Sequence, residues 1–290
     1  MSETAPPRRH WGIAVGTLAL LLLGLTVRSG IVFGLVVLGV IFIPMERLFA
    51  LRPQRTLRDR WRTDVVHLIV NNVLTTVGLL VAVVAVLVGV RWAINPSLWD
   101  AVRSQPALLQ LVEAILVADL AQYFAHRATH EVPFLWRFHK VHHSIEEMDW
   151  LAAGRLHPLD QVFTRTCIVV PLYLLGFSKA TFGAYLVFAT FHAIFLHANV
   201  RARLGPLRWV IAGPEFHHWH HANQPEAVNT NFAGNLPLLD VLFGTAHQPK
   251  GRMPASYGID DRVPQGYLAQ LAWPFTVTAR TPRATGATPR

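Results

Sequence analysis

Apolar stretches long enough to cross a lipid bilayer recur along much of this chain. A bilayer core requires roughly 20 apolar residues per helix. Four stretches approach that length, at 11–27, 31–50, 65–90 and 107–125, and a shorter pair follows at 162–176 and 180–197. Charged residues make up only 15% of the chain, against about 25% in soluble domains. We therefore expect an all-α fold, a polytopic integral membrane helical bundle of about four long spans plus a shorter hairpin that either crosses the bilayer or re-enters it.

The distribution of arginines predicts how these spans are oriented. Six arginines crowd the loop at 47–62, whereas the loops at 28–30 and 176–180 carry one basic residue each. By the positive-inside rule, the arginine-rich loop and both termini are expected in the cytoplasm. Anionic lipid and topology account for this basic loop, so we expect no nucleic-acid partner. Counting the spans onward from this loop places residues 126, 157 and 197 on the cytoplasmic side as well.

Histidines gather where the apolar stretches end. Ten of the fifteen histidines lie within 126–157 and 217–221, in the patterns H-x3-H and, twice, H-x2-H-H. On a helix, these offsets place each set of imidazoles within about 100° of arc. Each block should therefore present one coordinating face. The members of the blocks are His126, His130, His139, His142, His143, His217, His220 and His221.

The type and number of these side chains favour a site for two metal ions. Cys167 is the only cysteine, so thiolate ligation and an intramolecular disulfide are excluded. Zinc takes about four ligands and iron at most six, so this many imidazoles suits two ions. His197 should reach the same region from the end of its span, whereas spacing determines His157 less. His192 is expected to support the ligands, and His218 either to support them or to face solvent.

Asp119 lies one or two turns deeper than His126 on the same helical stripe. A carboxylate within a membrane span is costly and marks a functional site by default. We expect Asp119 to orient a ligating imidazole by a hydrogen bond. Asp64, His67 and Asn71 form a second polar stripe, which we interpret as a helix-packing network.

The histidine blocks belong to a longer run of motifs, HRATH…FHKVHHS…RLHPLD…LHANV…PEFHHWHH…NTNFAGNLPLLDVLFGT. This run resembles the fatty acid hydroxylase/sterol desaturase superfamily over about residues 115–248. The resemblance implies an integral membrane di-iron oxygenase with a histidine-rich helical cytoplasmic cap. Matched residue by residue, the family's metal ligands fall on His126, His130, His139, His142, His143, His157, His197, His217, His220 and His221.

The resemblance also implies partners and supporting residues. Two iron ions are the expected cofactor, with zinc possible in the purified protein. Asn231 and Asp240 lie in the family's closing motif and are expected to support the cap, although Leu239 stands where many members have tryptophan. No cytochrome b5 domain is apparent, so we expect a separate electron donor: a ferredoxin, a cytochrome b5-like protein or a reductase.

The expected reaction is oxygen-dependent hydroxylation, or desaturation, of a C–H bond in a lipid such as a fatty acyl chain, a sterol or a related isoprenoid. Two alternatives remain open: a metal-dependent lipid hydrolase, which needs neither O2 nor electrons, and a non-enzymatic membrane metal-binding or transport protein. Transporters hold their ligands near the bilayer midplane, unlike these blocks. The sequence does not identify the lipid, the carbon or the oligomeric state.

The chain is expected to form one membrane-embedded domain. We assign residues 1–10 to a polar tail and 11–248 to the domain, with the catalytic motifs at 115–248. Residues 249–290 are rich in Pro, Gly, Thr and Arg, and we interpret them as a polar, partly disordered tail.

Overall fold

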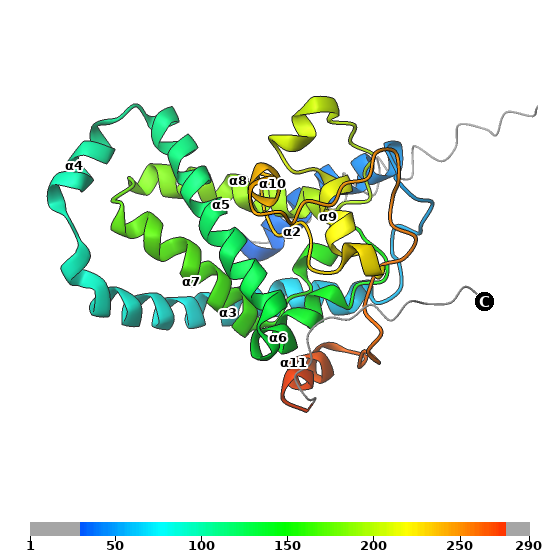
Figure 1. Cartoon of the computed structure of the whole chain (residues 1–290). Coiled ribbons are helices and arrows are strands. Elements are labelled where there is room, and N and C mark those ends of the chain that lie inside the picture. Colours follow the sequence, from blue (N-terminus) through cyan, green and yellow to red (C-terminus); the bar gives the residue numbers. More distant parts are fainter. Residues whose placement is uncertain (1–29, 277–290) are drawn as a thin grey trace, which may run out of the picture.

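A computed structural model of the chain describes residues 30–276, and every regular element in that range is helical (Figure 1). Only two isolated β-bridges, Ala50 with Val200 and Ala222 with Tyr257, break this pattern there. The all-helical expectation is confirmed for this part of the chain. The predicted span at 11–27 and the tail at 1–10 lie outside the described residues, as does the end from 277 on.

Six longer helices carry the predicted apolar stretches and the segment between them: α2 (Gly30–Leu48), α3 (Trp61–Val90), α5 (Ala107–Glu131), α6 (Pro133–His143), α7 (Pro158–Leu174) and α8 (Lys179–His197). The shorter helices are α4 (Pro96–Ser104), α9 (Pro214–His220), α10 (Leu238–Leu242) and α11 (Tyr267–Thr276). Single 3-10 turns lie at Arg91–Ala93, Ala152–Gly154, Gly205–Trp209 and Pro225–Ala227.

Within residues 30–276, three helices are long and apolar enough to cross a membrane. They are α3 with the turn that follows it (Trp61–Ala93), α5 and α8. The stretches predicted at 65–90, 107–125 and 180–197 fall within them.

Prolines set where several helices begin. Proline occupies the first helical position of α4, α6, α7 and α9, where no intrahelical N–H is required. Its effect is largest between α5 and α6. Val132 precedes Pro133 and takes an extended backbone conformation, with φ −91° and ψ 114°, as a residue before proline prefers. A single run of helix is thereby broken into two, and α6 packs back against the end of α5.

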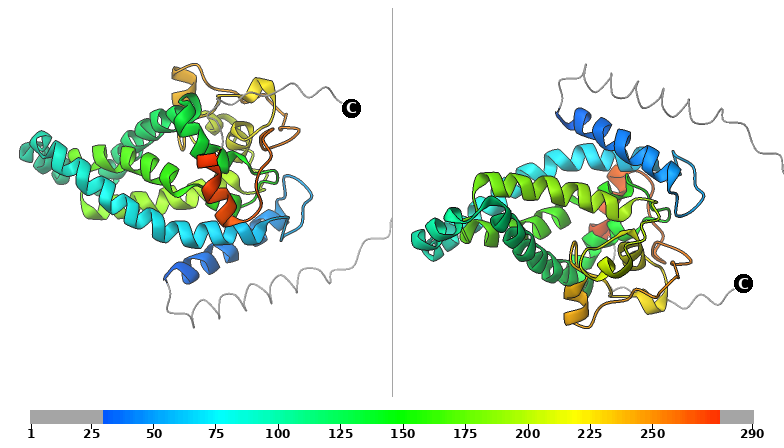
Figure 2. Two further views of the ribbon diagram at one scale, coloured as in Figure 1. Left: turned by 90° about the horizontal axis from the view of Figure 1, so that it is seen from below. Right: turned by 90° about the horizontal axis from the view of Figure 1, so that it is seen from above.

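The long helices run side by side, with α7 packed against both α3 and α5, and α8 against α5. Figure 2 shows α4 at one end of this bundle and α6, α9 and α10 gathered toward the other. Because α5 and α8 both end at the second set, the histidines at their C-termini meet α6 and α9 there.

The segment after residue 248, which we expected to be part of a polar tail, contributes a helix. In the described part of that segment, α11 packs on α3 and α6. Gln270 and Trp273 are buried in this contact. The composition of 249–290 does not reveal this packing, because it depends on contacts with the distant helices α3 and α6.

Candidate metal centre

Nine of the ten histidines expected as ligands converge at this end of the bundle, and all nine are buried. They form two groups, and in each group one nitrogen from every imidazole lies within 4.8 Å of the others. Group one comprises His126, His130, His139, His143 and His220. Group two comprises His142, His197, His217 and His221.

In group one, two imidazoles turn unprotonated nitrogens toward each other. His126 donates from Nδ1 to the carbonyl oxygen of Phe232 at 2.8 Å, and His139 donates from Nδ1 to the carboxylate of Asp160 at 3.0 Å. In the neutral form each of these imidazoles has its single proton on Nδ1, and its Nε2 atom is then a bare acceptor. These two Nε2 atoms lie 3.1 Å apart. Two lone pairs at this distance repel unless a cation lies between them.

Group two repeats this arrangement with different partners. His142 donates from Nδ1 to the carbonyl oxygen of Arg155 at 3.0 Å, and His197 donates from Nδ1 to the carbonyl oxygen of Ala193 at 2.7 Å. Their Nε2 atoms are therefore bare and lie 3.1 Å apart. The Nε2 atom of His217 lies 3.0 Å from that of His197. Three ring nitrogens thus face one point.

The remaining imidazoles present buried nitrogens that have no protein partner. Both ring nitrogens of His130 are in this state, as are Nε2 of His143 and Nε2 of His220. In group two, the Nε2 atom of His221 lies 3.1 Å from that of His217 and faces the same point. Leaving a buried polar atom unpaired costs about 1–3 kcal/mol. So many such atoms around two points match what bound metal ions require, and the donor set of neutral imidazoles suits iron or zinc.

Burial keeps these imidazoles in the form that binds metal. Burial first, and then the charge of neighbouring imidazoles, holds the pKa of His143 well below its usual value of 6.5. The same causes, in the same order, lower the pKa of His142, His217 and His221. A neutral ring is the ligating form, so the surroundings favour ligation at neutral pH.

Asp160 is a functional residue that sequence reasoning did not single out. It is buried at the start of α7 and accepts the hydrogen bond from His139. A carboxylate behind a ligating histidine fixes its tautomer and makes it a better ligand. The signal was present in the motif RLHPLD, where Asp160 follows His157 by three residues.

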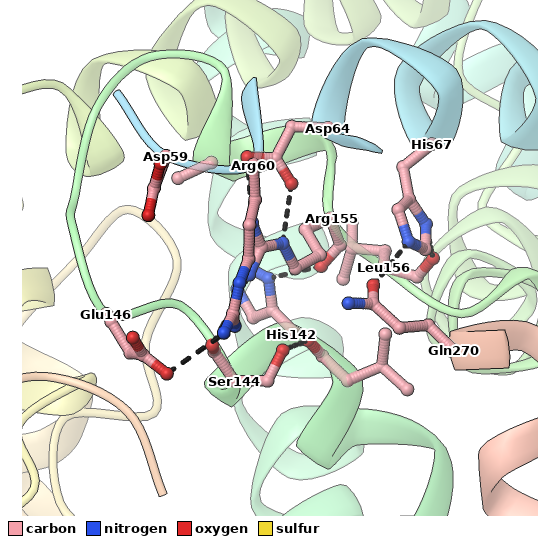
Figure 3. A network of polar contacts seen from close by, with 12 residues as sticks. Asp59, Arg60, Asp64, His67, His142, Ser144, Glu146, Arg155, Leu156 and Gln270 are labelled. Carbon is pink, nitrogen blue, oxygen red and sulfur yellow. Dashed lines mark hydrogen bonds and ion pairs between the residues drawn. The ribbon is translucent and has the colours of Figure 1, made fainter. Parts of the chain in front are cut away.

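A buried ionic network stands behind His142 (Figure 3). Arg155 binds both carboxylate oxygens of Asp64 at 2.5 and 3.0 Å and donates to the carbonyl oxygen of Ser144 at the end of α6. Arg58 joins Asp64 to Asp149. The network fixes the position of Arg155, whose backbone carbonyl oxygen accepts the hydrogen bond from Nδ1 of His142.

Asp64, His67 and Asn71 line one side of α3, and together they hold the segment that precedes α7. His67 and Asn71 lie 3.2 and 2.5 Å from the carbonyl oxygen of Leu156. His67 also meets Gln270 of α11 at 2.8 Å. This polar stripe packs elements together, as the sequence suggested.

His157 is not brought into either group. Its Nδ1 accepts the backbone N–H of Leu159 and caps α7, and its Nε2 lies 3.1 Å from the carbonyl oxygen of Leu271. Both nitrogens are thus engaged with backbone groups. The family pattern pointed to His157 as a ligand, whereas this geometry makes it a helix cap that ties α7 to α11.

Asp119 touches no imidazole, in contrast to our expectation. Its carboxylate accepts the backbone N–H groups of Gly234, Asn235 and Leu236 at 2.7–3.0 Å and the side-chain amide of Asn235. Its link to the ligands is indirect, because the loop that it holds includes Phe232, the acceptor of His126.

The other residues expected to support the ligands also act through backbone and neighbouring side chains. His192 contacts the side chain of Asn235 and the carbonyl oxygen of Ala212. His218 contacts the hydroxyl of Tyr257 at 2.8 Å. Asn231, at a positive φ of 58°, donates to the carbonyl oxygens of Phe216 and His247. Each joins segments around the centre without touching a ligand ring nitrogen.

Comparison with known proteins identifies the class. Residues 111–245 match the model of the fatty acid hydroxylase family, so this part of the chain is a fatty acid hydroxylase domain. The resemblance drawn from the sequence is confirmed. No solved structure matches the chain significantly.

Among the relatives are proteins that modify different lipids. Ornithine lipid hydroxylase OlsE from Rhizobium tropici is 38% identical over 175 residues, which cover 60% of this chain and 53% of that protein. Human alkylglycerol monooxygenase is 33% identical over 46% of this chain and 29% of its own length. A putative methylsterol monooxygenase from Dictyostelium discoideum is 26% identical over 71% of this chain and 75% of its own. The aligned part thus spans about half of the first relative and under a third of the second.

Proposed function

We propose that this chain is an integral membrane oxidoreductase that hydroxylates a C–H bond of a lipid at a di-iron centre, using O2 and an external electron donor. One observation carries the proposal: two groups of buried imidazoles aim bare nitrogens at two points inside a fatty acid hydroxylase domain. Hydroxylation is preferred to desaturation because its relatives are named hydroxylase and monooxygenase.

The protein residues hold and tune the centre. Iron ions bound by the two groups would supply the activation of O2. Asp160, together with the carbonyl oxygens of Phe232, Arg155 and Ala193, fixes which ring nitrogen of each partner histidine is free. Burial of all nine imidazoles keeps bulk water from the reacting atoms, which limits side reactions of an oxidant.

We infer that the domain at 11–248 spans the membrane and that its histidine-bearing end faces the cytoplasm. The arginine-rich loop before α3 supports this orientation, and three helices have the length and hydropathy of spans. In this arrangement α2 and the predicted stretch at 11–27 add further spans, and α7 with α8 forms the shorter hairpin. A soluble electron donor would then reach the centre from the cytoplasm.

The substrate is proposed to be a membrane lipid with a long hydrocarbon chain. The three named relatives act, according to their names, on ornithine lipid, alkylglycerol and methylsterol. These molecules share a large apolar part that does not dissolve in water. A site at the end of a membrane-spanning bundle meets such a substrate within the bilayer.

The test is turnover in nanodiscs made from the lipids of a host that expresses this chain. Iron-loaded protein, O2, reductant and an electron carrier should yield lipid that is heavier by one oxygen atom, with the label of ¹⁸O2 incorporated. The His220→Ala variant serves as the inactive control. Product that forms without O2 would instead indicate a hydrolase, and a product lighter by two hydrogens a desaturase. Metal flux without lipid modification would indicate a transporter.

A further inference from the structure

Residues 232–243, here called the α10 segment, form a non-helical stretch followed by α10, and its backbone donors are satisfied from within the protein. The carboxylate of Asp240 accepts the N–H groups of Phe232 and Ala233 at 2.7 and 2.8 Å. Asp119 accepts the next three N–H groups in the chain. Five consecutive backbone donors thus end on two carboxylates that are fully buried.

The position of Asp119 sets the depth of this segment. Asp119 lies six residues before residue 125, where the apolar stretch of α5 ends, which is about 9 Å along a helix that rises about 1.5 Å per residue. Because α5 is a candidate membrane span, the segment that binds Asp119 runs along the apolar part of that span. Figures 1 and 2 show α10 beside α5.

A second contact places the neighbouring loop at the same depth. The N–H of Ala212 donates to the carbonyl oxygen of Asn235 at 2.7 Å. The carbonyl oxygen of Ala212 in turn receives the ring N–H of His192, a residue within the candidate span α8. Two span helices therefore each use one buried polar side chain to hold backbone of non-helical segments.

The outer face of the α10 segment is apolar. Leu238, Val241, Leu242 and Phe243 are exposed, Leu242 to 68%. This face continues onto α5, because the ring of Phe243 lies 5.1 Å from that of Phe124. Leu116, Leu120 and Phe124, spaced by four residues, form an exposed stripe on α5. The only charged residue of the segment is the buried Asp240.

We propose that the α10 segment lies within the hydrocarbon layer of the membrane without crossing it, and that acyl chains of the leaflet nearest the histidine groups cover its exposed face. Non-helical backbone is tolerated at that depth only when the protein satisfies its polar groups, which the two carboxylates do. A large exposed apolar patch marks an interaction surface, and continuity with the lipid-facing stripe of α5 identifies the partner as lipid.

This inference depends on α5 and α8 crossing the membrane, as proposed above, and is independent of the metal chemistry. The inference also explains why a carboxylate, Asp119, lies inside a membrane span. A carboxylate there is expensive, and its role is to complete the hydrogen bonds of a segment that water does not reach.

The test measures where single cysteines on this face reside in nanodiscs. Cys167→Ala removes the one native cysteine. Leu242→Cys and Leu238→Cys report on α10, and Leu120→Cys reports on the apolar stripe of α5. Leu57→Cys is a matched control, since Leu57 is exposed to 57% but lies in the arginine-rich loop. Each cysteine carries a bimane fluorophore, and only variants that elute as the parent does on size exclusion are compared.

The labels at 242, 238 and 120 should lose most of their fluorescence with brominated acyl chains and none with aqueous iodide. The label at 57 should behave in the opposite way. Quenching by iodide at 242 and 238, with lipid quenching retained at 120, would overturn the inference and leave the membrane-spanning bundle intact. Iodide quenching at 120 as well would overturn both the inference about the α10 segment and the proposal that α5 crosses the membrane. Oxygen incorporation into lipid, measured separately, tests the proposed reaction.

Discussion

The two histidine groups share two helices but divide them in opposite ways. Helix α6 gives the pair His139 and His143 to group one and His142 to group two. Helix α9 and the residue that follows it give His217 and His221 to group two and His220 to group one. Residues four apart differ by about 40° around a helix and stay together, whereas adjacent residues differ by about 100° and separate. Each H-x2-H-H motif of this chain therefore contributes imidazoles to both groups.

The groups also differ in number and in support. Group one adds the pair His126 and His130 from α5 and reaches five imidazoles, while group two adds His197 from α8 and reaches four. A carboxylate, Asp160, supports group one, whereas the histidines of group two that have a known Nδ1 acceptor donate to backbone carbonyl oxygens. We therefore expect the two groups to bind metal with different affinities.

The largest effect is expected from removing one imidazole of each group. His220→Ala and His142→Ala should each abolish turnover and lose about one of two metal ions per chain, because each opens a different group. Metal analysis of the purified protein, alongside turnover, measures this. His247→Gln, outside both groups, is the control and should keep both ions. Full activity in either alanine variant would remove that residue from the ligands.

A smaller loss is expected from Asp64→Asn, which leaves Arg58 and Arg155 buried without their shared carboxylate. Breaking such a buried pair costs about 3–5 kcal/mol of stability, and the carbonyl oxygen behind His142 loses its anchor. Thermal unfolding should shift down, and metal should leave group two before group one. Arg60, whose pair with Glu146 is exposed, supplies the control Arg60→Gln. A thermal shift of the control that matches Asp64→Asn would contradict the buried-network explanation.

Asp160→Asn should act on group one alone. Loss of a carboxylate behind a ligating histidine weakens metal affinity by about 10- to 100-fold. A competitive chelator titration should therefore resolve one weakened site and one unchanged site. Asp261→Asn is a matched change, since Asp261 pairs with Lys140 of α6 from an exposed position, and it should leave both affinities as they are. Equal weakening of the two sites by Asp160→Asn would show that the groups are not separately supported.

The smallest effect on the metals is expected from Asp119→Asn. The amide group cannot accept the N–H of Leu236 as the second carboxylate oxygen does, which costs about 1–3 kcal/mol of stability. Folded protein should nevertheless keep both metal ions, because Asp119 touches no imidazole. Unfolding temperature and metal content, measured on the same sample, check this. A tenfold loss of metal from folded protein would mean that Asp119 acts on the ligands after all.

Much of this arrangement follows from the sequence, and the rest depends on contacts between distant residues. Hydropathy predicted the long helices, and the spacing of the histidines predicted which faces carry imidazoles. The assignment of His157 as a ligand stays a prediction; in the structure its Nδ1 caps α7 and its Nε2 meets α11, and the chain pattern does not reveal these contacts. Asp160 was overlooked because nothing local shows that α7 begins beside His139.

Asp119 was predicted to be a site residue, yet its partners too could not be predicted from the sequence. Its depth on α5 was read from the helical stripe that leads to His126, and its burial agrees with that reading. Its partners, however, lie more than a hundred residues later, at 234–236. A helical pattern fixes the direction of a side chain but not the segment that meets it.

The opposed bare nitrogens have a consequence for how the protein is made. A chain that closed around nine imidazoles with nothing between them would hold mutually repelling lone pairs at its centre. Metal uptake and completion of folding are therefore thermodynamically linked, so the bound metal takes part in folding as well as in the proposed chemistry. In a cell, the quantity of mature protein should follow the supply of that metal during synthesis, and chains made without it should be degraded by proteases.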